Sequence, residues 1–157
     1  MKHYPDLEAE ILELRRFKKE RHAAIQSAFF SGQQDLSETM AELTHTAEAI
    51  LLKAWRLAKE ELSHLYGPPG CRARDGSYLP SRFAVVGMGK FGGRELHFGS
   101  DLDLIFIYSC NGETQGPRSV TNKEYFAKLA QRIISYLTMT TPLGYAYKID
   151  TELRPSG

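Results

Sequence analysis

The stretch that decides the fold is a glycine-rich turn leading into a strand with two carboxylates, Gly87-Met88-Gly89-Lys90-Phe91-Gly92-Gly93-Arg94-Glu95-Leu96-His97-Phe98-Gly99-Ser100-Asp101-Leu102-Asp103. Runs of β-branched and aromatic residues at 83–86 and 102–108 flank the turn and predict two strands. Asp101 and Asp103 stand at i and i+2, so both side chains project from one face of the second strand. Such paired acids repel each other and are costly to desolvate, and a divalent cation relieves both effects.

A third carboxylate, Asp150, ends another predicted strand, residues 145–150. If that strand joins the same sheet, Asp150 can reach the pair formed by Asp101 and Asp103. Carboxylate oxygens are the ligands that Mg²⁺ prefers, and three of them can hold two ions for phosphoryl-type chemistry. The alternative is that Asp101 only ends the turn and Asp103 faces solvent on an edge strand.

The glycines of the turn also fit a second class of site. Gly87, Gly89 and Gly92 form G-x-G-x-x-G directly after a strand, which is the first half of a dinucleotide-binding fingerprint. The next strand follows too soon for a full crossover helix, so this match is weak. A Walker A loop is excluded because Phe91, not Ser or Thr, follows Lys90. A non-catalytic module that binds a nucleotide for regulation therefore stays open as an alternative.

Before the turn, apolar residues recur at helical spacing and predict an antiparallel pair of helices over residues 6–30 and 35–66. Asp35 to Glu38 form a capping box that opens the second helix. The charged face of the first helix is expected to be solvated, with docking of a partner as the alternative; its basic members are Arg15, Arg16, Lys18, Lys19 and Arg21. Residues 70–81 are expected to form a loop, and residues 122–140 a third helix.

The composition describes an ordinary globular chain of 157 residues, 42% hydrophobic, 25% charged, with a formal net charge of +1. This balance argues against disorder and against a nucleic-acid partner, which favours a strongly basic domain. The N-terminus lacks the apolar core of a signal peptide, and no apolar run spans a membrane. We therefore expect a soluble, cytoplasmic protein whose cysteines, Cys71 and Cys110, are free thiols.

At these residues the sequence resembles the glutamine synthetase adenylyltransferase family. The family motif is G-x-G-K-[LF]-G-G-x-E-L-x-[FY]-x-S-D-[IL]-D-L, followed later by V-D-x-R-L-R-P. The likeness is nearly continuous over residues 83–108, returns at 125–132 and ends at 149–157. It extends more loosely to the predicted helices. Glu152 departs from the pattern, because the family usually has Arg there, and this puts an anion contact at that position in doubt.

The resemblance implies an α+β chain in which a helical hairpin, residues 1–69, and a loop, residues 70–81, precede a nucleotidyltransferase core of polymerase β-like fold, residues 82–157. The core has a small mixed sheet and is expected to be part of a longer protein. The family has two such domains, one adenylylating and one removing AMP by phosphorolysis. The residues from Gly99 to Asp103 and the ending from Arg154 look more like the adenylylating copy, with the other copy as the alternative.

The function implied is transfer of AMP from ATP to a tyrosine of glutamine synthetase, which regulates nitrogen assimilation. The activity of this chain on its own is left open. Two Mg²⁺ ions, or Mn²⁺, would be held by Asp101, Asp103 and Asp150, while the expected nucleotide contacts are Gly92, Gly93, Ser100, Lys90, Arg94 and Arg154. Partners would be glutamine synthetase and a nitrogen-regulatory signal protein, the latter reached through parts of the longer protein; no nucleic acid and no membrane are expected.

Overall fold

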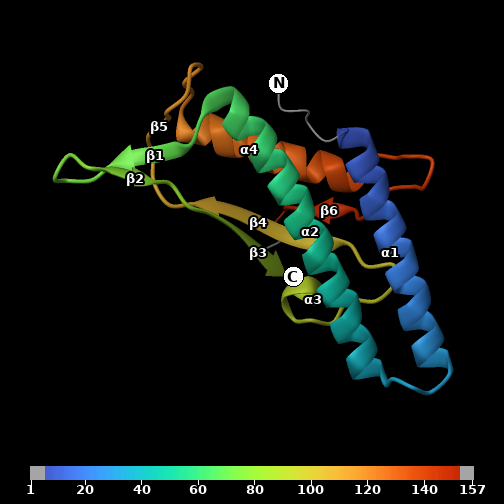
Figure 1. Ribbon diagram of the computed structural model, residues 1–157. Helices are drawn as coiled ribbons and strands as arrows, with labels where there is room; N and C mark the ends of the chain where they lie inside the picture. The colour runs from blue at the N-terminus through green and yellow to red at the C-terminus, as the bar shows by residue number, and fades with distance from the viewer. Residues whose placement is uncertain (1–5, 153–157) are drawn as a thin grey trace.

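A computed structural model describes residues 6–152, and it begins with two long helices packed as an antiparallel hairpin (Figure 1). Helix α1 spans Leu7–Phe30 and α2 spans Leu36–Tyr66. The predicted capping box is confirmed: the Asp35 carboxylate accepts from the Glu38 backbone amide, and the Glu38 carboxylate accepts from the Asp35 amide, both at 2.8 Å. These bonds satisfy amides that the first helical turn leaves without partners.

Helix α4, Asn122–Thr138, crosses α2 and contributes the other half of the core. Its apolar positions recur at helical spacing and are buried, as predicted: Phe126, Leu129, Ile133 and Leu137. The Phe83 ring stacks on the rings of Phe106 and Phe126, at centroid distances of 5.8 and 5.2 Å. Aromatic stacking therefore joins α4 to the sheet that carries the candidate site.

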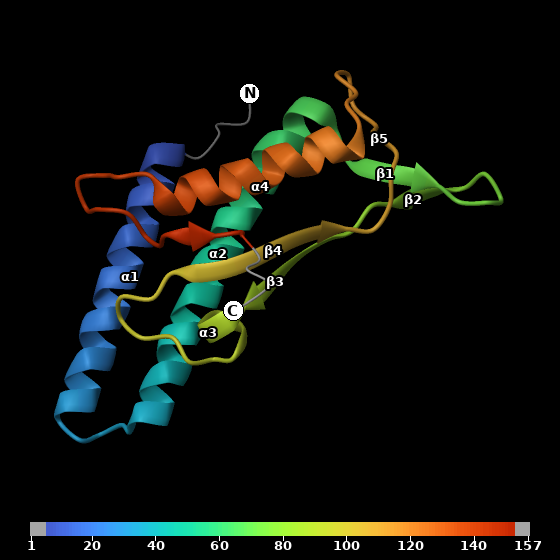
Figure 2. The same cartoon turned by 180° about the vertical axis from the view of Figure 1, so that it is seen from behind.

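Within residues 6–152 the strands form two sheets of three strands each. One has the order β3–β4–β6, from Phe83–Met88, Leu102–Tyr108 and Ile149–Asp150. Strands β3 and β4 are antiparallel, whereas β4 and β6 are parallel, so the expected small mixed sheet in an α+β chain is confirmed. A single helical turn, α3, spans Gly89–Gly92 after β3. Figure 2 shows β3 and β4 in front of α1 and α2, which lie behind the sheet.

The second sheet, of order β2–β1–β5, lies where the sequence predicts only loops. Its strands are β1 (Pro69–Arg72), β2 (Tyr78–Pro80) and β5 (Glu113–Thr114). The expectation of a loop over residues 70–81 is therefore wrong. Glycine and proline suppressed the strand signal there, yet the pairing of β1 with two neighbours supplies the backbone hydrogen bonds that a loop would lack.

The third predicted strand, residues 145–150, is shorter than expected. Only Ile149–Asp150 pair with β4. The amides of Ala146 and Tyr147 instead donate to the carbonyl oxygen of Leu137 at the end of α4, at 2.9 and 3.0 Å. A tertiary contact with a helix end has thus replaced the strand ladder over the first part of the segment.

Cys71 and Cys110 form a disulfide, which corrects the expectation of two free thiols. They are 39 positions apart in sequence, with Cα atoms 6.2 Å apart. The cause is the close packing of β1 against the segment after β4. Buried Asn122 donates there from Nδ2 to the carbonyl oxygens of both Gly70 and Cys110, each at 2.9 Å. This packing depends on long-range pairing, so the spacing of the cysteines does not reveal it.

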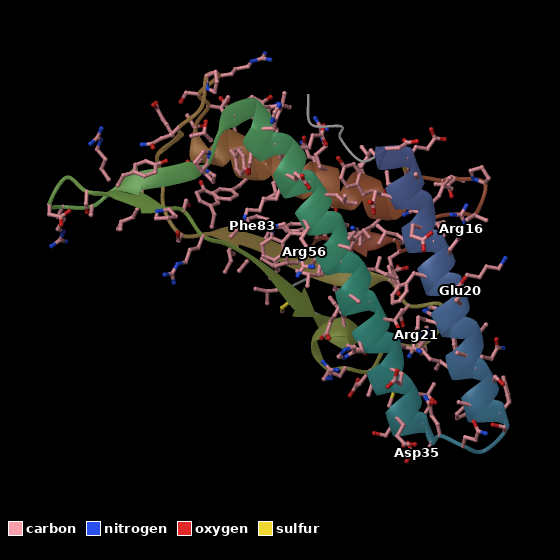
Figure 3. All side chains as sticks on the ribbon, viewed as in Figure 1. Arg16, Glu20, Arg21, Asp35, Arg56 and Phe83 are labelled. Atoms are coloured by element: carbon pink, nitrogen blue, oxygen red, sulfur yellow. A yellow bond between two sulfur atoms is a disulfide. The ribbon has the colours of Figure 1, made fainter. Side chains whose placement is uncertain are left out.

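The basic face of α1 is only partly solvated, which corrects the expectation of a solvated face. Arg16 has a side chain 56% exposed and pairs with Glu13 (Figure 3). Arg15, by contrast, is only 3% exposed, and Lys18 is partly buried. The burial of these two side chains is explained by their contacts with the segment before β6. None of the helices in residues 6–152 is long and apolar enough to cross a membrane.

Candidate functional site

The parallel pairing of β4 and β6 brings two of the three predicted carboxylates together. Asp103 of β4 and Asp150 of β6 are register partners, and Leu102 pairs with Ile149 beside them. Residues directly opposite each other on neighbouring strands project from the same face of a sheet. Asp101 immediately precedes β4 and is exposed, whereas Asp103 and Asp150 are partly buried. All three therefore lie at one end of this sheet.

The glycine-rich turn touches this end through Gly89. Met88, the last residue of β3, is the register partner of Asp103. Gly89 follows with φ of +53°, and a Cβ there would lie 2.4 Å from Oδ2 of Asp103. Only glycine adopts this conformation readily and leaves room for the carboxylate. The site thus contains a space beside Asp103 that any other side chain would fill.

The carboxylates have few protein partners. Oδ1 of Asp150 accepts from the Glu152 amide at 2.8 Å. Among residues 6–152, no ion pair involves Asp101, Asp103 or Asp150. In the same part of the chain, no three His, Cys, Asp or Glu side chains converge closely enough to hold a metal ion as they stand. The register fits a carboxylate-bound cation shared by Asp103 and Asp150, whereas Asp101 would have to turn toward them.

The remaining predicted contacts occupy the turn between β3 and β4. Lys90 Nζ lies 3.2 Å from Nε2 of His97. The Ser100 hydroxyl accepts from the His97 amide at 2.9 Å, so it closes the turn that leads to Asp101. The Gly93 amide donates to the Gly89 carbonyl at 2.9 Å and is therefore committed to α3.

Gly92 and Arg94 have clear packing roles in this turn. A Cβ on Gly92 would lie 2.4 Å from the Gly87 carbonyl oxygen, so glycine lets α3 pack onto the end of β3. Arg94 has a positive φ of 58°, and its Nη1 is ion-paired with Oε1 of Glu48 in α2 at 2.8 Å. The predicted contact Arg154 lies outside the described residues.

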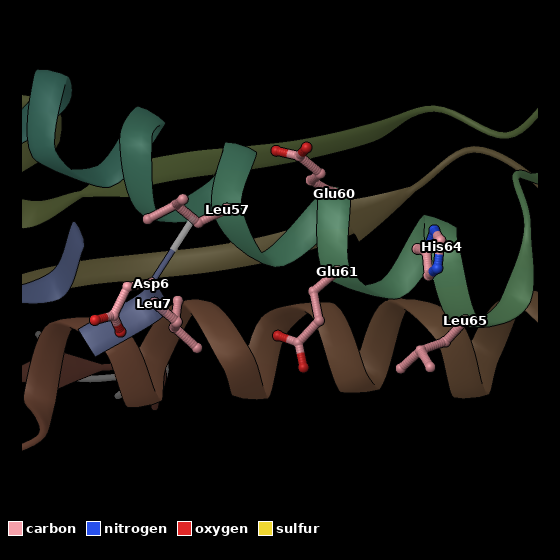
Figure 4. Close-up of a pocket in the computed structure, with 7 residues that line it drawn as sticks. All are labelled: Asp6, Leu7, Leu57, Glu60, Glu61, His64 and Leu65. Atoms are coloured by element: carbon pink, nitrogen blue, oxygen red, sulfur yellow. The ribbon is translucent and has the colours of Figure 1, made fainter. Parts of the chain in front are cut away.

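Two cavities lie near these elements. One, of about 450 Å³, lies between α2 and the glycine-rich turn and is lined by Glu48, Leu51, Leu52, Trp55, Val85, Gly87, Phe91, Gly92 and Arg94. It borders the glycine-rich turn on the side of α2. The other, of about 490 Å³, lies farther along α2, beside the start of α1 (Figure 4). It is lined by Asp6, Leu7, Leu57, Glu60, Glu61, His64 and Leu65. None of the predicted site residues lines this second cavity.

Comparison of the sequence with known proteins identifies its family. The family model described as glutamate-ammonia ligase adenylyltransferase matches residues 1–157. The chain belongs to this family. Three similar relatives carry the name bifunctional glutamine synthetase adenylyltransferase/adenylyl-removing enzyme. The relative from Thioalkalivibrio sulfidiphilus is 38% identical over 152 residues, that from Ralstonia nicotianae 41% over 145, and that from Pseudomonas aeruginosa 40% over 154.

These matches cover nearly all of this adenylyltransferase-family chain but little of its relatives. They include 97%, 92% and 97% of this chain, against 15%, 15% and 16% of the respective relatives. The chain therefore spans about 15% of the length of the relatives it matches. Its α+β fold, with the two carboxylate strands paired in parallel, corresponds to a small part of these much longer relatives.

Reasoning from the sequence missed one residue of this family member's site. The sequence predicts ligand contacts for Gly92 and Gly93, and the structure adds Gly89 as the glycine beside a site carboxylate. The signal was present in the sequence, because Gly89 comes shortly after the predicted strand at 83–86, which must turn back onto β4. Antiparallel pairing then places that turn beside the first residues of β4.

Proposed function

We propose that this chain carries the metal-binding part of a nucleotidyltransferase that moves AMP from ATP to a tyrosine hydroxyl of glutamine synthetase. The observation that carries the proposal is the register of Asp103 with Asp150, beside a turn whose Gly89 leaves room at Asp103. Two carboxylates on neighbouring strands, without a cationic protein partner among the described residues, are costly unless a cation joins them. The names of the relatives supply the substrate.

In this proposal Asp101, Asp103 and Asp150 would hold two Mg²⁺ ions, with Mn²⁺ as a possible replacement. When bound, such ions acidify an attacking hydroxyl and neutralise the charge of a triphosphate. Lys90 is the first candidate for a further phosphate contact, since among the described residues its ammonium has only His97 as a partner. Arg94 reaches a phosphate only if it leaves Glu48, and Ser100 only if its hydroxyl turns from the His97 amide.

The reaction is an in-line displacement at the α-phosphorus of ATP. The tyrosine oxygen forms a bond to this phosphorus, the bond from the phosphorus to the bridging oxygen of the β-phosphate breaks, and pyrophosphate leaves with the bonding electrons. The hydroxyl proton passes to solvent or to one of the aspartates. Positioning of the two reactants and stabilisation of charge supply most of the rate in phosphoryl transfer, and the chain's carboxylate end would provide both.

Removal of AMP is the second candidate, because the names of the relatives include an adenylyl-removing activity. There phosphate attacks the same phosphorus, ADP forms, and the tyrosine oxygen leaves and regains its proton. The same carboxylates serve both directions. The residues from Gly99 to Asp103 favour the adenylylating copy, so adenylyl transfer is the first proposal.

The test compares Asp103→Asn with Glu13→Gln in this chain and in a full-length relative at the matching positions. Glu13 is an exposed carboxylate on α1 whose ion pair within residues 6–152 is with Arg16, so it controls for loss of one acid. We expect Asp103→Asn to lower Mg²⁺-dependent transfer of labelled AMP to glutamine synthetase at least about a hundredfold, because an amide binds the cation far less well than a carboxylate. Glu13→Gln should keep the wild-type rate.

Wild-type rates in Asp103→Asn would contradict the proposal. The same proteins distinguish the alternatives: incubation with phosphate and adenylylated glutamine synthetase reports removal, and a titration of ATP with and without Mn²⁺ reports a regulatory module. Nucleotide binding that needs no metal and persists in Asp103→Asn would favour the non-catalytic nucleotide-binding module.

A further inference from the structure

Strand β6, which carries Asp150, has little to hold it in place by itself. It is 2 residues long, and its register with β4 consists of two residue pairs. The amide of Leu102 adds a bond to the carbonyl oxygen of Lys148 at 2.9 Å. Short strands of this kind are marginal without support from other elements. The position of Asp150 therefore depends on the segment that leads into β6, residues 139–148.

Helix α1 holds this segment through Arg15, from the other end of the sequence. Its guanidinium donates to three backbone carbonyl oxygens: Nη1 to Tyr136 at 2.6 Å, Nη2 to Met139 at 2.8 Å and Nε to Gly144 at 3.3 Å. Tyr136 lies in the last turn of α4, and Met139 is its C-cap. A cation here satisfies carbonyls that the helix leaves without partners and opposes the negative end of the helix dipole.

Lys18, one turn farther along α1, holds the next part of the segment. Its ammonium donates to the carbonyl oxygen of Ala146, and it lies 4.1 Å from the centroid of the Tyr147 ring. A cation over an aromatic face is attracted by the ring, more strongly where water is excluded. Ala146 is fully buried and Tyr147 is 4% exposed. The two cations thus fix the segment at points just before Ile149.

Neither cation has a carboxylate partner within the described residues. All five contacts of Arg15 and Lys18 go to this segment, to the end of α4 or to the Tyr147 ring. Burial lowers the pKa of both side chains, and the charge of Arg15 lowers that of Lys18 further. Burying two cations costs free energy. Here the contacts of both cations fix the path of the chain that leads into Asp150.

We propose that Arg15 and Lys18 are positioning residues that set the place of Asp150 beside Asp103. Their value for catalysis rests on the proposed function, in which Asp150 is a metal ligand. The helical hairpin is then part of the site's construction, because its first helix supplies the groups that place a carboxylate more than 120 positions away in sequence. The planar guanidinium of Arg15 is required to hold this segment, because a lysine ammonium cannot reach three carbonyl oxygens in that arrangement.

The experiment uses this chain with Arg15→Lys and Lys18→Met, and with Arg16→Lys as the matched control. Arg16 neighbours Arg15 but lies on the exposed side of α1 (Figure 3). The first readout is hydrogen exchange at the amides of Leu102, Ala146 and Tyr147, whose acceptors lie in this segment or at the end of α4. We expect both variants to speed this exchange at least about tenfold relative to amides of α2, with no change in Arg16→Lys.

The second readout is the dissociation constant for Mn²⁺, measured by electron paramagnetic resonance. We expect it to rise at least about fivefold in both variants. Lys18→Met decides the matter if Arg15→Lys does not fold. Unchanged exchange at the three amides, or equal acceleration throughout the chain, would overturn the positioning role. So would faster exchange with unchanged Mn²⁺ affinity. A wild-type chain that binds no Mn²⁺ would count against the proposed function, while the exchange measurement still decides whether the two cations hold β6.

Discussion

The two three-stranded sheets hold their strands together by different means. Strand β1 of the β2–β1–β5 sheet is tied to the segment after β4 by the disulfide between Cys71 and Cys110. Fully buried Asn122 adds hydrogen bonds to carbonyl oxygens of both. The β3–β4–β6 sheet ends in three aspartates that no described basic side chain neutralises. Arg15 and Lys18 of α1 contact the end of α4 and the segment that leads into its last strand.

Strand β4 and the segment after it connect the two sheets. Leu102, at the start of β4, lies beside the acidic end, which is the end of the sheet with Asp101, Asp103 and Asp150. Cys110 follows the other end of β4, which we call the disulfide end. Seven residues of strand span about 20 Å. The covalent and neutral polar constraints therefore lie away from the acidic end, whose charges no described basic side chain compensates. Changes at one end should then leave the other end intact, and the following predictions test this separation.

The largest effect is expected from Cys71→Ser combined with Cys110→Ser. Loop closure over a separation of 39 residues predicts a loss of about 4 kcal/mol in the free energy of unfolding. Urea denaturation of the variant and the wild type under non-reducing conditions measures it. Because the disulfide lies at the far end of β4, the Mn²⁺ dissociation constant of the folded variant should stay within about twofold of the wild-type value. A large loss of Mn²⁺ affinity in the folded state would show that the two ends are coupled.

The second-largest effect is expected from Gly89→Ala, at the acidic end. The new Cβ would lie 2.4 Å from Oδ2 of Asp103, at a positive φ, so the carboxylate or the turn must shift. A shift of about 1 Å at a reacting centre costs about a hundredfold in rate. We expect that loss in adenylyl transfer, with the disulfide end and its urea resistance largely retained.

Gly99→Ala is the control for this substitution. It lies in the same turn, but a Cβ there meets nothing within 4 Å. It should change the rate less than about threefold. Equal losses in both variants would mean that the turn is sensitive to any added side chain, and the special role of Gly89 would be refuted.

The acidic end was more accessible to reasoning from sequence than the disulfide end. A local run of β-branched and aromatic residues predicts strand β4, and its bounds, Leu102–Tyr108, match that run. Asp150 could be placed beside Asp103 because strands separated by a helix commonly pair in parallel. The disulfide could not be predicted, since it requires β1 to pair with β5, and β5 is only 2 residues long with no apolar pattern.

Arg15 shows a second limit of sequence reasoning. Five basic residues lie within seven positions of α1, and composition assigns them all to a solvated face. Arg15 is buried because the end of α4 and the turn at Gly144 present carbonyl oxygens there. Backbone acceptors carry no sequence signal, so only the folded structure distinguishes Arg15 from its exposed neighbour Arg16.

The smallest effect is a pH dependence of the free energy of unfolding, which arises where α1 packs against the turn before β4. His22 of α1 packs edge-on against Phe98 in the turn before β4, with ring centroids 5.5 Å apart. Burial, with a smaller effect from the charge of Lys18, lowers the pKa of His22 from 6.5 to about 4. The unfolded chain therefore binds a proton between pH 6.5 and 4 that the folded chain does not. The free energy of unfolding falls as pH falls through this window.

We expect His22 to account for about 1–2 kcal/mol of that fall, less than the full shift implies because the side chain is only partly buried. Urea denaturation at pH 7.5 and pH 4 gives the fall for wild type, His22→Leu and His45→Leu. His45 has a side chain 78% exposed and serves as the control. His22→Leu should reduce the fall by that amount, and His45→Leu should not. If the two variants behave alike, the packing of α1 against the turn does not account for the fall.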